Sequence, residues 1–288
     1  MTTPHAASTA ATRAEALGAR LPPLVVQAER VAMTVMQGVH GRRRSGQGDA
    51  FWQFRPFLPG DSASRVDWRQ SARSDRLFVR ETEWEAAQTV GLWRDASDSM
   101  RWRSDGAATT KAERAEMLLL ALAALLLRGG ERVRLLDHAS RSLTGRGALE
   151  RLAESLPRTT GPAEDPALPR HARVVLFGDF LAPLDEISRM VGQLAARPVR
   201  GQLVQVLDPA EEILPYAGRV RFEGFGREEP ALVPRVEGIR ALYAERLARH
   251  REGLAAIASA AGWGFSTHRT DTPPETALLA LYQALSPA

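Results

Sequence analysis

Two short polar loops contain the residues of this sequence best suited to chemistry. Asp95, Ser97 and Ser99 stand in the pattern D-x-S-x-S directly after an apolar stretch, and Asp179 directly follows a second apolar stretch, after one glycine. Carboxylate and hydroxyl oxygens suit Mg²⁺, a hard cation that takes six oxygens and keeps several waters. The pattern therefore predicts a partial oxygen shell for Mg²⁺ or another hard divalent cation.

Neutral serine oxygens leave such a metal under-neutralised, so it would seek an anionic ligand from a partner protein. Two other interpretations stay open. The aspartate can begin a turn whose serines cap the next helix, in a module that binds no metal. Alternatively, Asp95 can be the nucleophile of a metal-dependent phosphohydrolase. Such an enzyme needs an acidic residue two positions on, where Ser97 stands, and the only lysine, Lys111, is not in the usual place.

Alternating strand and helix patterns after residue 86 place both loops at one edge of a sheet. Expected strands are residues 89–93, 132–137, 141–144, 173–177, 202–207 and 264–268. Expected helices are residues 110–127, 148–156, 183–195, 236–260 and 274–285. This alternation predicts a doubly wound, mostly parallel α/β sheet over residues 86–288, covered by helices on both faces. Ligands bind such sheets beyond the carboxyl ends of the strands.

The residues before this domain divide into two parts. Residues 1–12 are small and polar, which predicts a disordered lead-in without the order of a signal peptide. Residues 13–85 begin with an apolar stripe that predicts a helix starting near Pro23. An arginine- and aromatic-rich stretch follows, with a turn at residues 59–61. We expect the N-terminal helix and this small β-rich segment to pack on the α/β domain.

The β-rich segment concentrates charged residues around its aromatic residues. A docking surface is one interpretation. A buried ion-pair network is the other, and it is favoured for Asp61, Arg65, Asp67 and Trp68, although burying unpaired charges is unfavourable. The residues expected to act in binding or in such a network are Arg55, Asp61, Arg65, Asp67, Trp68 and Arg73.

The composition excludes several classes of protein. The chain has 288 residues, 44% of them hydrophobic and 25% charged, which are globular proportions. It has no cysteine, so disulfides, thiolate metal sites and thiol catalysis are impossible. A net charge of +4 is no nucleic-acid signature. The longest apolar stretch is about half of the roughly 20 residues that a membrane span needs. We therefore expect a cytoplasmic protein without a membrane span.

Several motifs follow one another in a specific order. They are P-G-D at residues 59–61, R-V-D-W at 65–68, S-A-R at 71–73, D-A-S-D-S-M at 95–100 and G-D-F at 178–180. Together they resemble a von Willebrand factor A domain and, more specifically, the bacterial domain-of-unknown-function family 58. The resemblance implies a metal-ion-dependent adhesion site with Asp95, Ser97 and Ser99 in its first loop and Asp179 in its last.

The middle loop of such a site normally offers a threonine, and Thr144 is the plausible match. Its T-G-R-G context lacks the usual threonine-rich pattern, and the neighbouring Arg146 could take the place of the cation. Inside the first loop, Asp98 adds a negative charge that could compensate.

The resemblance also implies binding rather than catalysis. Family members are often encoded beside MoxR-type AAA+ ATPases, which assist the assembly or metal loading of other proteins. We therefore expect a non-enzymatic adaptor or client-recruiting partner of such an ATPase. Its adhesion-site Mg²⁺ would bind an acidic residue of the partner, and the phosphohydrolase using Asp95 remains the alternative.

Overall fold

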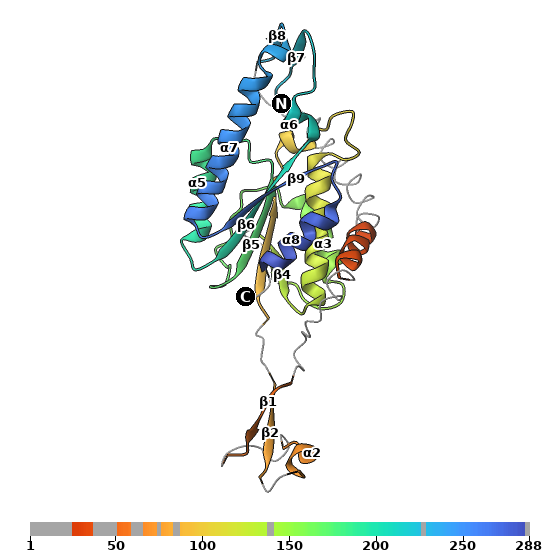
Figure 1. Cartoon of the computed structure of the whole chain (residues 1–288), viewed down its shortest axis with the longest axis vertical. Coiled ribbons are helices and arrows are strands. Elements are labelled where there is room, and N and C mark those ends of the chain that lie inside the picture. The colour runs from red at the N-terminus through yellow and green to blue at the C-terminus, as the bar shows by residue number, and fades with distance from the viewer. Residues whose placement is uncertain are drawn as a thin grey trace, which may run out of the picture. The chain divides into compact units, whose positions relative to one another are not determined.

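The computed structural model describes residues 25–36, 51–58, 66–73, 76–82, 87–136, 141–225 and 229–285. The chain forms two compact units (Figure 1). The larger α/β unit contains residues 1–38 and 88–288, and the smaller unit contains residues 39–87.

A five-stranded parallel sheet with the strand order β4-β3-β5-β6-β9 forms the centre of the α/β unit. The strands are β3 (Thr89–Arg94), β4 (Arg132–Leu135), β5 (Arg173–Gly178), β6 (Arg200–Leu207) and β9 (Gly264–Arg269). The chain passes from β3 to β4 on one side and then crosses to β5 on the other. The carboxyl ends of β3 and β5 therefore flank the switch point of the sheet, where α/β proteins bind ligands. The predicted doubly wound α/β fold is confirmed.

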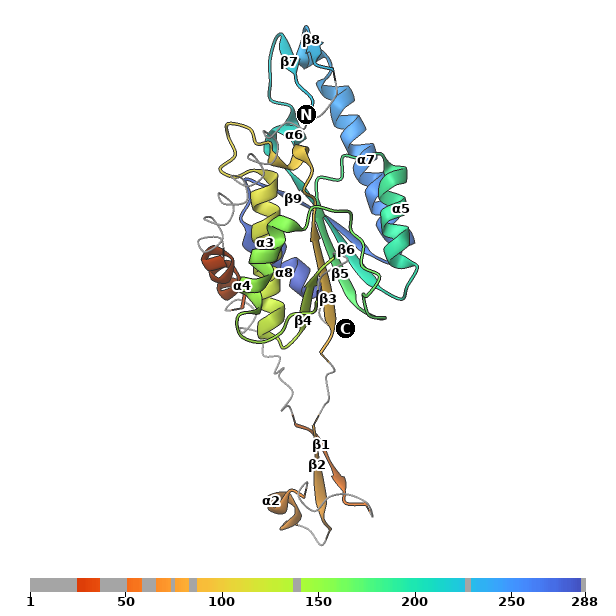
Figure 2. The same cartoon turned by 180° about the vertical axis from the view of Figure 1, so that it is seen from behind.

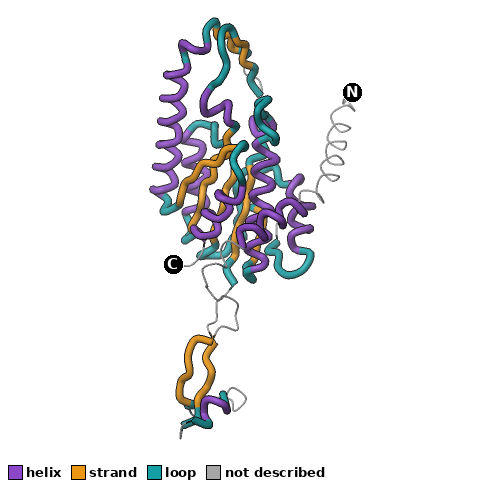
Figure 3. Tube along the Cα trace, turned by 45° about the vertical axis from the view of Figure 1, so that its right-hand side comes forward, coloured by secondary structure: helices purple, strands orange, loops and turns teal. Residues whose placement is uncertain are grey.

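Helices cover both faces of the sheet. They are α3 (Lys111–Arg128), α4 (Ala148–Ser155), α5 (Leu184–Ala195), α6 (Pro209–Ile213), α7 (Arg240–Ala260) and α8 (Pro274–Leu285). Helices α5 and α7 pack together on one face, and α3 packs with α4 and α8 on the other (Figures 1 and 2). Figure 3 shows the strands enclosed between these two layers. The described residues of the unit also include the 3-10 turns η2 (Asp98–Arg101), η3 (Leu156–Arg158) and η4 (Val236–Gly238), and the antiparallel pair β7 (Val220–Phe222) and β8 (Ala231–Val233).

Helix α3 is the most enclosed element, because most of its side chains from Met117 to Leu126 are buried. A capping box fixes its start: the Thr110 side chain accepts from the backbone of Glu113, and Glu113 accepts from the backbone of Thr110. The predicted N-terminal helix is present at residues 25–36. It buries Ala28, Val31, Ala32 and Val35.

One predicted strand did not form as expected. Residues 141–144 contribute only a single bridge, in which Leu143 pairs antiparallel with Val133 of β4. This segment is therefore an edge contact rather than a strand of the parallel sheet.

The smaller unit contains an antiparallel pair, β1 (Phe51–Pro56) and β2 (Phe78–Thr82), and the short helix α2 (Trp68–Ser71). Val66 and Val79 are buried and form an isolated bridge. The Ser71 hydroxyl accepts a hydrogen bond from the backbone of Phe78 at 2.9 Å, which ties α2 to β2.

The position of β6 depends on a close approach between Gly201 and Trp263. A Cβ atom on Gly201 would lie 2.2 Å from the indole ring. That ring is 6% exposed, and its N–H donates to the carbonyl of Val199 at 3.1 Å. A rigid, hydrogen-bonded ring has little room to move, so only glycine fits here.

We predict that Gly201→Ala lowers the free energy of unfolding by about 2 kcal/mol through overpacking. Urea denaturation measures this change. Gly192→Ala in α5 is the control, because a Cβ atom there meets nothing within 4 Å. That variant should gain about 0.5–1 kcal/mol from helix propensity. Equal stability of the Gly201 variant and the unsubstituted protein would contradict the close approach.

Candidate functional site

The loops that follow β3 and β5 meet at the carboxyl edge of the sheet. The backbone N–H of Asp95 donates to the carbonyl of Phe177 at 2.7 Å, which fixes the end of β3 against β5. The approach is also close at Gly178, the last residue of β5, where a Cβ atom would lie 3.0 Å from the Cβ of Asp95. Asp95 and Asp179 are therefore in adjacent loops at the switch point, as the sequence predicted.

A chain of hydrogen bonds joins the four predicted residues of the two loops. The backbone N–H of Ser97 donates to Oδ1 of Asp95 at 2.8 Å. The hydroxyls of Ser97 and Ser99 are 3.0 Å apart. The Ser99 hydroxyl then donates to Oδ2 of Asp179 at 2.7 Å. The D-x-S-x-S loop thus closes onto the loop after β5, with Ser97 exposed and Asp179 buried.

Lys111, the first residue of α3, belongs to the same cluster. Its side chain is 0% exposed. The ammonium donates to Oδ2 of Asp179 at 2.9 Å and to Oε1 of Glu211 at 2.5 Å. Three loops, those after β3, β5 and β6, therefore converge on one buried positive charge.

Glu211 belongs to α6, which begins directly after β6. Its Oε2 accepts from the backbone of Asp208, while an Asp208 oxygen accepts from the backbone of Ala210 at 2.8 Å. This is a capping box, and it fixes the carboxylate that faces Lys111. Asp208 and Glu211 were not among the site residues predicted from the sequence. The only sequence feature that pointed to the contact of Glu211 with Lys111 is that the chain's single lysine stands at the start of a helix.

Burial dominates the electrostatics of the site. Burial raises the pKa of Asp95, and the charge of Asp179 adds to the effect, although the Ser97 backbone N–H opposes it. Burial also raises the pKa of Glu211, although the charge of Lys111 opposes that rise. Burial and the charge of Glu211 raise the pKa of Tyr243 to about 12. Its hydroxyl stays protonated and donates to the backbone carbonyl of Glu211 at 2.5 Å.

The structure does not bring Thr144 or Arg146 to this edge. Thr144 follows Leu143, which pairs with Val133 near the amino end of β4. Asp95 follows the carboxyl end of β3, whereas Thr144 lies beside the amino ends of the strands. Because a strand rises about 3.3 Å per residue, the two residues are roughly 20 Å apart. Both Thr144 and Arg146 are exposed there. The segment runs antiparallel to β4, which carries the threonine away from the switch point.

Comparison with known families identifies the chain. The family described as "Protein of unknown function DUF58" matches residues 53–253. The chain belongs to the DUF58 family. No curated protein matches the sequence.

Solved structures similar to this DUF58 chain include a conserved hypothetical protein BatB from Bacteroides thetaiotaomicron, at 11% identity and a TM-score of 0.41 over 69% of this chain and 98% of that one. A second is an aerotolerance-related membrane protein from Bacteroides fragilis, at 13% identity and a TM-score of 0.41, covering 68% of this chain and 98% of that one. A third is the VWA domain of SpRpn10, at 10% identity and a TM-score of 0.34, covering 68% of this chain and 95% of that one.

The comparisons contradict the expected cytoplasmic location. The similar structure from Bacteroides fragilis is described as that of a membrane protein, so a cytoplasmic assignment is not retained. Among the residues that the structure describes, no helix combines the length and apolarity that a bilayer span requires.

A divalent cation fits the described residues poorly. Thr144 is absent from the site, and Oδ2 of Asp179 already accepts hydrogen bonds from Ser99 and Lys111. A cation on the Ser99 hydroxyl would lie within about 8 Å of the Lys111 ammonium. Repulsion from Lys111 at that distance is about 4 kcal/mol at an effective dielectric constant of about 20, and it offsets part of the attraction that the Asp95 and Asp179 carboxylates would exert. Within the described ranges, no three or more His, Asp or Glu side chains are grouped to hold a metal.

The geometry also gives the phosphohydrolase alternative no support. Burial raises the pKa of Asp95, and the charge of Lys111 opposes that rise. The Lys111 ammonium is, however, fully enclosed and directed at two carboxylates, so it is not presented to a substrate phosphate. Ser97 occupies the position where a general acid is needed.

The predicted residues of the smaller unit have different roles. Asp67 caps α2 by accepting from the backbone of Gln70 at 2.9 Å. Trp68 is 65% exposed at the first position of that helix, so it is not part of a buried network. Arg73 is exposed. Asp61 and Arg65 lie outside the described residues, as does the side chain of Arg55.

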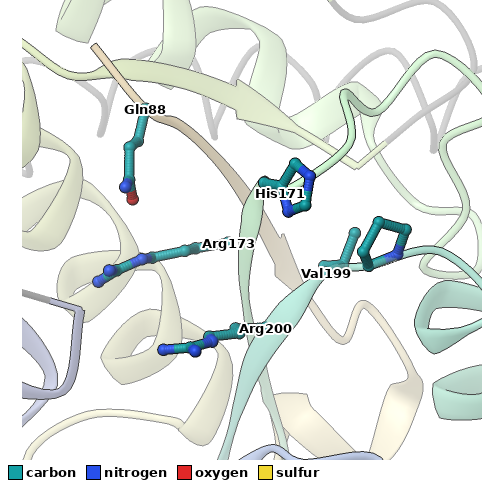
Figure 4. A pocket seen from close by; sticks show the side chains of 6 residues that line it. Gln88, His171, Arg173, Val199 and Arg200 are labelled. Atoms are coloured by element: carbon teal, nitrogen blue, oxygen red, sulfur yellow. The ribbon is translucent and has the colours of Figure 1, made fainter. Parts of the chain in front are cut away.

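A pocket of about 360 Å³ opens at the amino edge of the same sheet (Figure 4). Arg173 and Arg200 extend side by side from β5 and β6, near Gln88 and His171. Burial and the charge of Arg200 lower the pKa of Arg173. None of the residues predicted from the sequence lines this basic pocket, so it is separate from the site at the carboxyl edge.

We predict that Asp95→Asn stabilises the protein at neutral pH. When folding raises the pKa of a carboxyl group, the protein loses stability as the pH rises through that raised pKa. Asparagine removes the negative charge and keeps an oxygen that can accept the hydrogen bond from Ser97. The gain should shrink as pH falls to about 4, where the aspartate is protonated. Thermal denaturation across this pH range measures it.

Asp98→Asn is the matched control, because Asp98 is exposed and pairs with exposed Arg101. Its effect should stay within about 0.5 kcal/mol. Destabilisation of the Asp95 variant at neutral pH would contradict an unfavourable charge at this position.

Proposed function

We propose that the chain is a non-enzymatic interaction module that binds a partner protein at the carboxyl end of its α/β unit. The partner that family resemblance implies is a MoxR-type AAA+ ATPase, for which the chain would act as adaptor or recruit a client. Nucleotide-driven motion in the ATPase could then make or break the contact.

Exposed apolar side chains at the carboxyl end support this proposal most directly. Six large apolar residues there are between 36% and 57% exposed. They are Leu181, Ile213, Phe225, Leu232, Ile239 and Leu242. They belong to the loop after β5, to α6, to the β7–β8 hairpin or to the residues at the start of α7, which lie at one end of the sheet (Figure 1). Exposed apolar residues gathered in this way are typical of protein-interaction sites.

Polar groups at the same end can give such a contact specificity. Ser97 and Asp98 are exposed in the loop after β3, next to the buried cluster of Asp179 and Lys111. Interfaces commonly combine apolar contacts with a polar rim. The hydrogen bonds from Ser97 through Ser99 to Asp179 hold this polar loop in place. The surface is therefore pre-ordered for binding.

Binding of purified MoxR-type ATPase from the same organism tests the proposal. Leu232→Glu and Leu242→Glu each place a charge on the proposed surface, and we expect at least tenfold weaker binding, equivalent to about 1.4 kcal/mol. Val26→Glu is the matched control, because Val26 is 56% exposed on the helix at residues 25–36. It should bind like the unsubstituted protein.

Two results would count against the proposal. Unchanged binding by both leucine variants would exclude this surface, and no binding by the unsubstituted chain would exclude this ATPase as partner. Phosphoester hydrolysis that Asp95→Asn abolishes would instead favour an enzyme.

A further inference from the structure

We propose that the Lys111 ammonium supplies the positive charge at the carboxyl edge in place of a divalent cation, so that the site is complete without metal. This inference concerns the interior of the site and does not depend on the identity of the partner.

The contacts of Lys111 are those of a central cation. Its ammonium contacts carboxylates from two separate loops, Asp179 after β5 and Glu211 on α6. Oδ2 of Asp179 is shared with the Ser99 hydroxyl, which brings in the loop after β3. One positive charge thus joins the segments after β5 and β6 directly, and the loop after β3 through Asp179.

Complete burial separates Lys111 from an ordinary surface ion pair. A lysine is almost never fully buried unless it is paired, and this one has no exposed surface. The capping box of Thr110 and Glu113 fixes the backbone from which the side chain starts. The position of the ammonium is therefore fixed by the folded structure, unlike that of a flexible lysine side chain on the surface.

The choice of residue is also specific. The chain contains 38 lysines and arginines, and Lys111 is its only lysine. An ammonium is a compact point charge with three donors, whereas a guanidinium is a wide planar fork. A compact cation suits the space between two carboxylates and a hydroxyl. The one position where this chain uses lysine is thus the one where a compact, fully buried cation faces two carboxylates.

Metal titration of the full-length, unsubstituted protein tests the inference directly. We expect the same melting temperature in 5 mM MgCl₂ and in EDTA, to within about 1 °C, and no heat of Mg²⁺ or Mn²⁺ binding by calorimetry. A site occupied by metal under these conditions would raise the melting temperature by about 5 °C. Such a rise, if Ser97→Ala removed it, would overturn the inference.

Lys111→Met tests the same point from the opposite direction. Methionine keeps an unbranched side chain but removes the charge, so the carboxylates of Asp179 and Glu211 lose their cation. We expect a lower melting temperature in EDTA and a partial recovery in MgCl₂. A folded variant that does not respond to Mg²⁺ would show that Lys111 does not occupy the place of a cation.

Arg128→Met is the matched control, because it removes a cation from the other end of α3, where Arg128 pairs with Glu29. It should lack any response to Mg²⁺. If Lys111→Met does not fold, the titration of the unsubstituted protein still decides the question. Neither measurement involves a partner, so failure here leaves the proposed interaction surface untouched.

Discussion

The buried contact of one ammonium with two carboxylates is the interaction on which the carboxyl edge depends. Lys111, Asp179 and Glu211 come from α3, the end of β5 and α6, so the contact fixes three elements at once. Losing one partner of a buried pair typically costs about 3–5 kcal/mol, because the remaining charge is left without compensation. The loops of the site therefore cannot rearrange independently of the helix beneath them.

This cluster also connects the site to the surface proposed for binding. Glu211 holds the first turn of α6 through its capping box, and Tyr243 of α7 donates to the Glu211 carbonyl. Arg251 of α7 and Arg269 of β9 both pair with Glu212, the next residue of α6. The short helix α6 is thus tied to three neighbours, and its last residue, Ile213, is one of the exposed apolar residues.

The sequence could predict which residues follow the strands, because parallel strands place their carboxyl ends at one edge. Asp95, Ser97, Ser99 and Asp179 came together for that reason. Thr144 did not, because a short β-like stretch says nothing about its direction, and this one runs antiparallel at the far edge. The role of Lys111 was equally hidden. A residue at a helix start can be exposed or enclosed, and only packing decides which.

An enclosed ammonium changes what a partner can recognise. A bound metal leaves an open coordination position for an acidic side chain, whereas an ammonium without exposed surface offers none. Under the proposals made above, a partner would contact the outer layer, which includes the exposed Ser97 and Asp98 and the exposed apolar residues. Contacts of that kind depend on buried apolar area more than on charge, and added salt screens them little. In this proposal the charge inside the site stabilises the loops, and the exposed surface makes the contacts with the partner.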